Sequence, residues 1–311
     1  MSEPEQQNQQ EQEESLARIE RGGIPISAER RLSELRESGG AATFTSDLSV
    51  NGFALCHQLG LTPLSQVMGS SIYQMGYQSS WGAGGGYGRG GVLFELDSLS
   101  EALNEVRGRA LVRLGEEARH VGADAVVGVQ TRAGESELET GTLALEHVVV
   151  GTAVRREGAR AQAPVLTELS VAEYAMLLQG GFEPLGIVAW SSVFFTSYVF
   201  GGMIAGGGAM TMGVQSFELR EFTQAVYAAR EAAMQRVSGQ ASALGASGVV
   251  GMQIGHTVRP HTLSGGMGMG GGLGGGQLTG MMVTFTAVGT AIRQHGEHTV
   301  PAPKTTVDLF T

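Results

Sequence analysis

Lysine, aspartate and cysteine are almost absent from this chain of 311 residues. Its only lysine, Lys304, lies near the C-terminus, which excludes a P-loop and a Schiff-base enzyme. The four aspartates form no Asp-x-Asp run for Ca²⁺ or Mg²⁺. The single cysteine, Cys56, can form neither an internal disulfide nor a Cys-x-x-Cys site. Because the sequence also shows no nucleophile–base motif, we interpret the protein as non-enzymatic.

Charge is scarce as well, and what there is has the wrong sign for binding nucleic acid. The net charge is −10, and no basic patch is visible, so we expect no nucleic-acid partner. The chain opens with an acidic, Gln-rich stretch and shows no secretory signal, so we expect a cytoplasmic protein.

Three long stretches carry no formal charge, namely 48–88, 184–217 and 261–292. Soluble surfaces normally carry interspersed charge, so these stretches are expected to be buried in the core, in a partner subunit or in a membrane. The run 185–206 is long enough to span a membrane once. Its counterpart 64–85, however, contains three glutamines in the same frame. We therefore favour a ring interior or a subunit interface over membrane contact.

The chain contains an internal duplication. Residues 48–73 align with 169–194 at an offset of 121, and 118–130 align with 241–253 at an offset of 123. A third block near the end of each copy aligns at an offset of 138. Three blocks in the same order predict two similar domains, over 41–158 and 165–295.

Each copy shows the same order of expected elements. A short helix (49–59, 170–179) precedes an extended run (61–73, 182–195) and a glycine-rich loop (82–91, 201–213). A long amphipathic helix (98–120, 217–243) ends at Gly122 or Gly245, and two strands follow (124–130 with 146–155, 247–254 with 281–292). The stretches 131–144 and 255–280 are expected to be loops. Residues 1–40 are expected to be a disordered acidic segment with one short helix at 27–36, and 296–311 a tail.

Three blocks of repeat 1 resemble the YbjQ family, which is described as a heavy-metal-binding domain. They are Gly69-Ser70-Ser71-Ile72-Tyr73, Gly122-Ala123-Asp124-Ala125-Val126-Val127-Gly128-Val129 and Gly151-Thr152-Ala153-Val154. The resemblance implies two tandem α+β units and assembly into rings, which are pentamers in the single-domain members. We therefore expect a homo-oligomeric ring, and a pentamer of tandem chains would display ten units. The predicted interface residues lie in the charge-free strands: Gly69, Ser70, Ser71, Ser191 and Ser192.

The candidate metal ligands lie in the long loop expected at 255–280. His256 and His261 flank Pro260, and Met267 and Met269 follow. Such a loop could gather these side chains around a soft ion such as Cu(I) or Zn²⁺. The alternative is a flexible loop with incidental polar residues, because no zinc-finger spacing exists. A further alternative is an oligomeric scaffold or pore-like assembly that contacts a membrane or a partner protein through its Gly/Met-rich loops.

Overall fold

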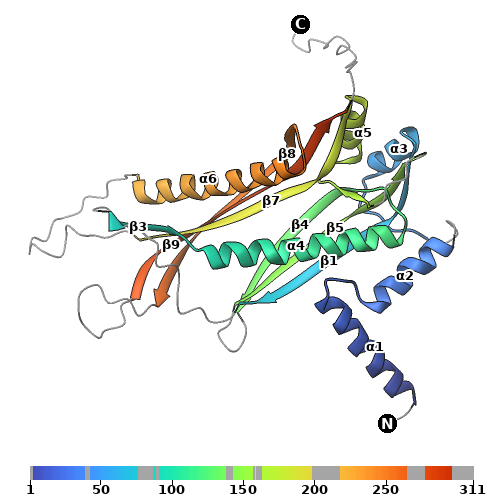
Figure 1. Cartoon of the computed structure of the whole chain (residues 1–311), viewed down its shortest axis with the longest axis horizontal. Helices are drawn as coiled ribbons and strands as arrows, with labels where there is room; N and C mark the ends of the chain where they lie inside the picture. Colours follow the sequence, from blue (N-terminus) through green and yellow to red (C-terminus); the bar gives the residue numbers. More distant parts are fainter. Residues whose placement is uncertain are drawn as a thin grey trace, which may run out of the picture.

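The structure is a computed structural model that describes residues 3–38, 43–75, 87–88, 91–137, 143–156, 158, 163–197, 218–264 and 277–295. Two mainly antiparallel sheets each carry one long helix, and two short helices lie together at one end of the molecule (Figure 1). The predicted fold, two tandem α+β units, is confirmed.

The elements occur in the predicted order in both repeats. Repeat 1 consists of α3 (Val50–Gln58), β1 (Leu61–Gln74), β2 (Tyr87–Gly88), β3 (Gly91–Glu95), α4 (Asp97–His120), β4 (Ala125–Glu137) and β5 (Leu143–Arg156). Repeat 2 consists of β6 (Val165–Leu166), which pairs with β4 of repeat 1, and of α5 (Val171–Gln179), β7 (Phe182–Ser197), α6 (Arg220–Ala243), β8 (Gly248–Ser264) and β9 (Gln277–Gln294). Ser49 and Ser170 cap the short helices through their side chains, as their positions predict. Gly122 and Gly245, just past the long helices, have φ of 74° and 69° and take the left-handed conformation that stops a helix.

The strands extend well into the stretches expected to be loops. β4 continues to Glu137 and β5 begins at Leu143, while β8 continues to Ser264 and β9 begins at Gln277. These extensions are largely polar or rich in glycine, so they lack the apolar alternation by which a strand is recognised in a sequence. Antiparallel backbone pairing nevertheless continues along them, for example between Ala133 and His147.

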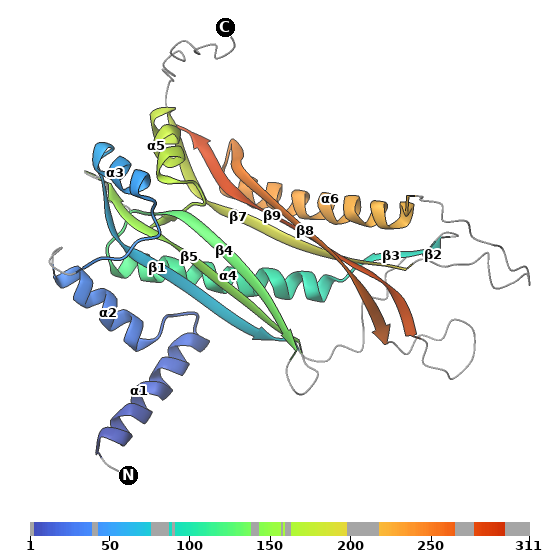
Figure 2. The same ribbon diagram turned by 180° about the vertical axis from the view of Figure 1, so that it is seen from behind.

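A strand of repeat 1 belongs to the sheet of repeat 2. The first sheet has the strand order β1-β5-β4-β6, and the second has the order β2-β3-β7-β9-β8. β3 precedes α4 in repeat 1, yet it pairs with β7 of repeat 2, from Val92 opposite Ser197 to Glu95 opposite Phe194. α4 follows directly and packs on β1 and β5 while its N-terminal half contacts β7 (Figure 2). The two repeats are therefore interlocked.

α4 lies unusually close to β1. A Cβ atom at Gly69 would fall 1.9 Å from the carbonyl oxygen of Ala110, so a larger residue at position 69 would displace the helix. Around this contact Ala110 and Leu114 of α4 pack on Val67, Val126 and Val149 of the sheet, all of them buried.

The N-terminal segment, expected to be disordered apart from one short helix at 27–36, contains two helices. Glu3–Glu20 form α1, and Ile26–Glu37 form α2, which begins after Pro25. α2 is docked rather than frayed, because the side chain of Leu32 is fully buried against α4 and its sheet. Arg113 of α4 also donates to the carbonyl oxygens of Ile19 (2.9 Å) and Gly23 (3.2 Å). Glu, Gln, Ala and Arg favour helix formation, and these contacts hold the helices in place.

Candidate functional site at the junction of the repeats

The outer edge of β7 is closed by side chains and backbone from two helices. Gln240 of α6 accepts from the backbone N–H of Ala189 (2.9 Å) and donates to its carbonyl (3.1 Å). Asn104 of α4 does the same for Ser191, with both distances at 2.8 Å. Every second residue of an edge strand turns its backbone outward, so these amides act in place of a neighbouring strand.

The next outward-facing residue, Val193, is bound by the start of α4. Its N–H donates to the hydroxyl of Ser100 (2.9 Å), and its carbonyl accepts from the N–H of Leu96 (2.7 Å). Ser100 in turn donates to Glu95 (3.2 Å). Val193 itself is completely buried, so the N-terminal half of α4 covers this edge fully.

Arg107 is the charged centre of the junction. It is buried, and its guanidinium donates to the hydroxyl of Ser191 (2.5 Å) and to Oδ1 of Asn104 (2.7 Å). Burial lowers its pKa to about 10, and the negative charge of Glu168 acts in the opposite direction. Buried charges are costly unless paired, so this group links α4 to β7 in one specific arrangement.

Two further titratable groups lie within the electrostatic range of Arg107. Burial raises the pKa of Glu168 to about 7, while Arg107 lowers it. Burial lowers the pKa of His147 to about 4, and Arg107 lowers it further. Nε of Arg107, Nε2 of His147 and Oε2 of Glu168 are buried without a hydrogen-bond partner among the described residues. The junction is therefore a polar interior whose protonation responds to pH.

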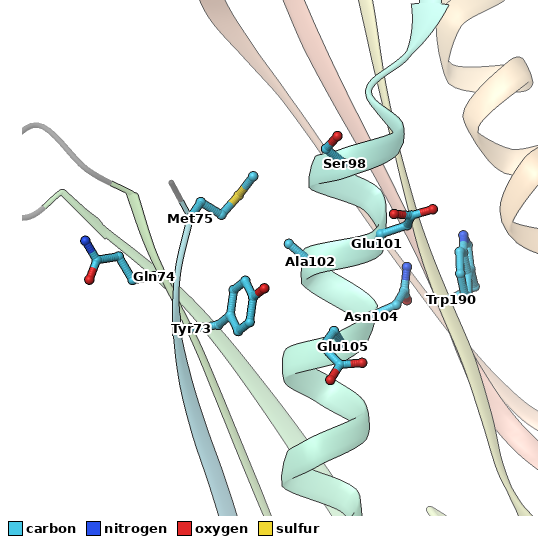
Figure 3. Close-up of a pocket in the computed structure, with 9 residues that line it drawn as sticks. All are labelled: Tyr73, Gln74, Met75, Ser98, Glu101, Ala102, Asn104, Glu105 and Trp190. Atoms are coloured by element: carbon cyan, nitrogen blue, oxygen red, sulfur yellow. The ribbon is translucent and has the colours of Figure 1, made fainter. Parts of the chain in front are cut away.

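A cleft of about 590 Å³ opens beside this junction, between the end of β1 and the N-terminal half of α4 (Figure 3). Tyr73 of β1 and Met75, just after the end of β1, lie on one side of the helix, and Trp190 of β7 lies on the other. Glu101 and Glu105 give the lining a negative charge.

The outer edge of β1 corresponds to that of β7 but is not covered by a strand in the described part of the chain. Met68 donates its backbone N–H to Glu117 (2.8 Å), and the carbonyl of Ser70 accepts from Arg113 (2.5 Å). Farther along, the side chain of Ile72 is 72% exposed, whereas that of its counterpart Val193 is 0% exposed. An apolar side chain is thus left in solvent on one of two equivalent edges.

The predicted interface residues are mostly enclosed by their own chain. Gly69 packs on α4, Ser191 is bound by Arg107 and by the hydroxyl of Thr286 (2.7 Å), and Ser71 and Ser192 are buried. At these four positions α4 and the neighbouring strands of the same chain supply the contacts, and a role between copies stays a prediction. Ser70 is exposed on the outer edge of β1 and remains a candidate.

The structure does not bring the candidate metal ligands together. His256 and His261 lie in β8, five residues apart, and therefore point to opposite faces of the sheet. Met267 and Met269 lie outside the described residues. Among the residues that are described, no group of three or more His, Cys, Asp or Glu side chains is placed to hold a metal ion. Cys56 is buried in the core beside the partly buried Leu177.

The sequence alone did not identify the junction residues, which are Arg107, His147 and Glu168. They are ordinary polar residues in an amphipathic helix, a strand and a linker, and no short motif contains them. One signal was present: Arg107 recurs as Arg230 at the offset of 123, and Glu168 recurs as Asp47 at the offset of 121. Charge retained at both copies of a repeat indicates a role that the repeats share.

The fold and the junction define a protein of two interlocked α+β repeats. The model of the YbjQ family, described as "Putative heavy-metal-binding", matches residues 64–157 and 184–294. The chain belongs to this family. It is also 37% identical over 240 residues to the encapsulin nanocompartment protein Rv1762c of Mycobacterium tuberculosis. That match covers 73% of this chain and 81% of the relative. No solved structure matches the chain.

None of the helices in the described ranges is both long and apolar enough to cross a membrane. The run 185–206, considered above for its length, lies in β7 as far as Ser197 and outside the described residues beyond it.

Proposed function

We propose that this protein is a non-enzymatic, self-assembling protein whose copies join into a closed homo-oligomeric ring. The observation that carries the proposal is the difference between the two equivalent edges. On β7 the edge is covered by α4 and β3, whereas on β1 it exposes Ile72 beside an open cleft. Contact with another copy would remove this apolar surface from water, and a cyclic arrangement does so for every copy alike.

The relative in M. tuberculosis is named as an encapsulin nanocompartment protein, and this supports a role in a protein assembly. We propose that the present chain serves such a compartment, either as part of it or in association with it. From the family resemblance, a pentamer of chains remains the expected ring, and the cytoplasm remains the expected location.

Native mass spectrometry at micromolar concentration tests this function. The proposal expects an integer multiple of the 32.4 kDa chain mass, with five copies as the specific expectation. A monomer at that concentration would refute self-assembly, and a closed assembly of another size would correct only the copy number.

Binding of a soft metal ion, Zn²⁺ or Cu(I), through His256, His261, Met267 and Met269 remains a prediction. Because the two histidines face opposite sides of β8, a site that uses both requires ligands from two copies or from residues beyond the described strands. Metal analysis of the purified protein before and after chelation, with His256→Ala and His261→Ala as comparisons, tests it. Metal that is absent, or unaffected by either substitution, would exclude this ligand set.

A further inference from the structure

The start of α6 and the two residues before it carry, in exposed or partly exposed positions, the residues with which α4 covers β7. The two helices have the same length, 24 residues, and are related by the offset of 123. Glu95, Leu96, Ser100 and Arg107 thus correspond to Glu218, Leu219, Thr223 and Arg230. The local geometry is repeated too, because Thr223 donates to Glu218 (2.9 Å) as Ser100 donates to Glu95.

Exposure separates the two helices. Leu96 is 2% exposed beneath β7, whereas Leu219 is 40% exposed. Arg107 is buried against Ser191, whereas Arg230 lies at the surface beside Glu231. The N-terminal half of α6 therefore presents the same contact residues as α4 without the strand that α4 covers.

The edge of β1 supplies the complementary residues. At the offset of 121, Ser70 and Ile72 correspond to Ser191 and Val193, and Asp47 corresponds to Glu168. Asp47 is placed as its counterpart is, because its backbone N–H donates to the hydroxyl of Thr152 (3.3 Å) and that of Glu168 donates to the hydroxyl of the equivalent Thr290 (3.3 Å). The contact of α4 with the edge of β7 thus has a second set of equivalent residues on the surface of the same molecule. The helix residues recur at the start of α6, and the strand residues recur on the edge of β1.

We infer that the N-terminal half of α6 in one copy lies along the outer edge of β1 in the next copy, in the way that α4 lies along β7. The inference rests on the self-assembly proposed above and names its contact. The N–H of Leu219 would meet the carbonyl of Ile72, and the hydroxyl of Thr223 would accept from the N–H of Ile72. Arg230 would meet the hydroxyl of Ser70 and the carboxylate of Asp47, which has the opposite charge.

The cleft beside β1 fits the same arrangement. Tyr73, Met75 and Ala102 line it, and their counterparts in repeat 2 are Phe194, Thr196 and Ala225. There the equivalent space is taken by β3, which pairs with Phe194 and Thr196 and packs Leu93 in the cluster that contains Ala225. By position in the repeat, Glu218 of the next copy corresponds to Glu95 at the end of β3. The occupant to which we commit is therefore a second copy of the chain, which enters with the start of α6.

One position departs from the repeat. Asn104, which binds both backbone groups of Ser191, is replaced in α6 by Tyr227, whose side chain is exposed. A phenol offers one O–H and a large apolar ring, so the contact between copies exchanges one amide hydrogen bond for apolar area. Such a contact joins heterologous surfaces, and repetition of it around an axis closes a ring.

Two substitutions that each damage one side of the contact test the inference. Ile72→Asp damages the β1 side and Leu219→Asp damages the α6 side, and both side chains are exposed in the single chain, so folding is preserved. Ile254→Asp is the matched control, because Ile254 is 57% exposed on β8 and its counterpart Thr131 takes no part in the junction. Thermal unfolding of each variant confirms that it folds.

The expected result is that wild type and Ile254→Asp assemble, whereas each of the other two variants is monomeric. When Ile72→Asp and Leu219→Asp are mixed, one intact contact remains between an α6 of the first and a β1 of the second. The mixture should therefore give a 1:1 dimer of twice the chain mass and nothing larger, by light scattering after size exclusion.

Assembly of either single variant, or a mixture that stays monomeric, would overturn the inference while the assembly of wild type still stood. A wild-type protein that is itself monomeric would instead refute the proposed function. If Asp at position 72 or 219 lowered the melting temperature, Ile72→Ser with Arg230→Glu would serve as the second pair, with the same expected outcomes.

Discussion

The outer edges of β1 and β7 come from the same duplicated sequence and have opposite surroundings. On β7, Gln240, Asn104, Ser100 and Leu96 bind the backbone of three alternate residues, and Val193 is buried. On β1 the corresponding residue, Ile72, is exposed. After a duplication, one copy of a helix-to-strand contact can thus form within the chain, here α4 on β7. The second copy of both surfaces, on α6 and β1, remains available to another molecule.

The two edges also differ in how closely their own helix approaches. Gly69 of β1 lets the backbone of α4 come near, whereas its counterpart in β7 is Trp190, which stacks under Arg236 at 4.9 Å from the ring centroid. In repeat 1 the small residue Gly69 therefore allows α4 to lie close to its own sheet. In repeat 2 the large side chain of Trp190 occupies the equivalent position in the sheet.

The largest expected difference between the two equivalent positions is seen when the buried arginine, Arg107, is removed. Arg107→Ala leaves Ser191, Asn104 and Glu168 without their cationic partner, and we expect a loss of about 4 kcal/mol in the free energy of unfolding. Arg230→Ala, at the exposed equivalent position, should cost about 0.5 kcal/mol or less in the isolated chain. Denaturant unfolding of both variants at a concentration where the protein is monomeric makes the comparison. Equal losses would show that the two arginines are not distinguished by burial.

Leu32 tests whether the N-terminal helices belong to repeat 1. The side chain is fully buried, so Leu32→Ala should cost about 3 kcal/mol by creating a cavity. Leu16→Ala in α1 is the control, because Leu16 is 61% exposed and its loss should be small. A melting temperature unchanged by Leu32→Ala would return these helices to the disordered segment expected from the sequence.

Gly69→Ala tests how closely the backbone of α4 lies to β1. The added methyl group would meet the carbonyl oxygen of Ala110, and the helix must shift, at a cost of about 2 kcal/mol. Gly108→Ala lies in the interior of α4 with open space around it, so it should be neutral or slightly stabilising. Chemical denaturation of the two variants gives the result, and equal effects would contradict the close approach.

The smallest expected effect concerns pH. Glu168 has its pKa raised to about 7, so the folded state holds this proton between about pH 4.5 and 7 and loses stability as pH rises through that window. His147 has its pKa lowered to about 4, so stability rises with pH between about 4 and 6.5. In the wild type the two contributions oppose each other, and stability should change little between about pH 4.5 and 6.5.

The contributions of Glu168 and His147 to the pH dependence of stability can be measured separately by substitution. Glu168→Gln should make stability rise with pH across this window. His147→Phe, which copies Phe285 of repeat 2, should make it fall. Unfolding at a series of pH values measures both slopes, and two variants with the same slope as wild type would show that neither group titrates as described.

The sequence predicted the repeat and the order of elements because glycine stops, serine caps and helical periodicity are local signals. It did not predict β3, because Gly91–Glu95 directly follows the stretch expected to be a glycine-rich loop, and its pairing with β7 of the other repeat has no local signal. Ser191 and Ser192 were expected at an interface between copies because their strand lacks charge; within the chain they are buried, and Ser191 is bound by Arg107. Arg107 was not predicted to be buried, because only the position of β7 against α4 buries it.

Disulfide formation between engineered cysteines tests the central claim most directly. Leu96→Cys with Val193→Cys is the reference pair, because the backbones of these residues are hydrogen-bonded and a bond within the chain should form. Leu219→Cys with Ile72→Cys is the test pair, at the equivalent positions. Under oxidation the account predicts covalent dimers and higher multimers of the test pair on a non-reducing gel, and only monomers of the reference pair. An assembled test protein that forms no bond between chains would contradict the claim that β1 of one copy is covered by α6 of the next.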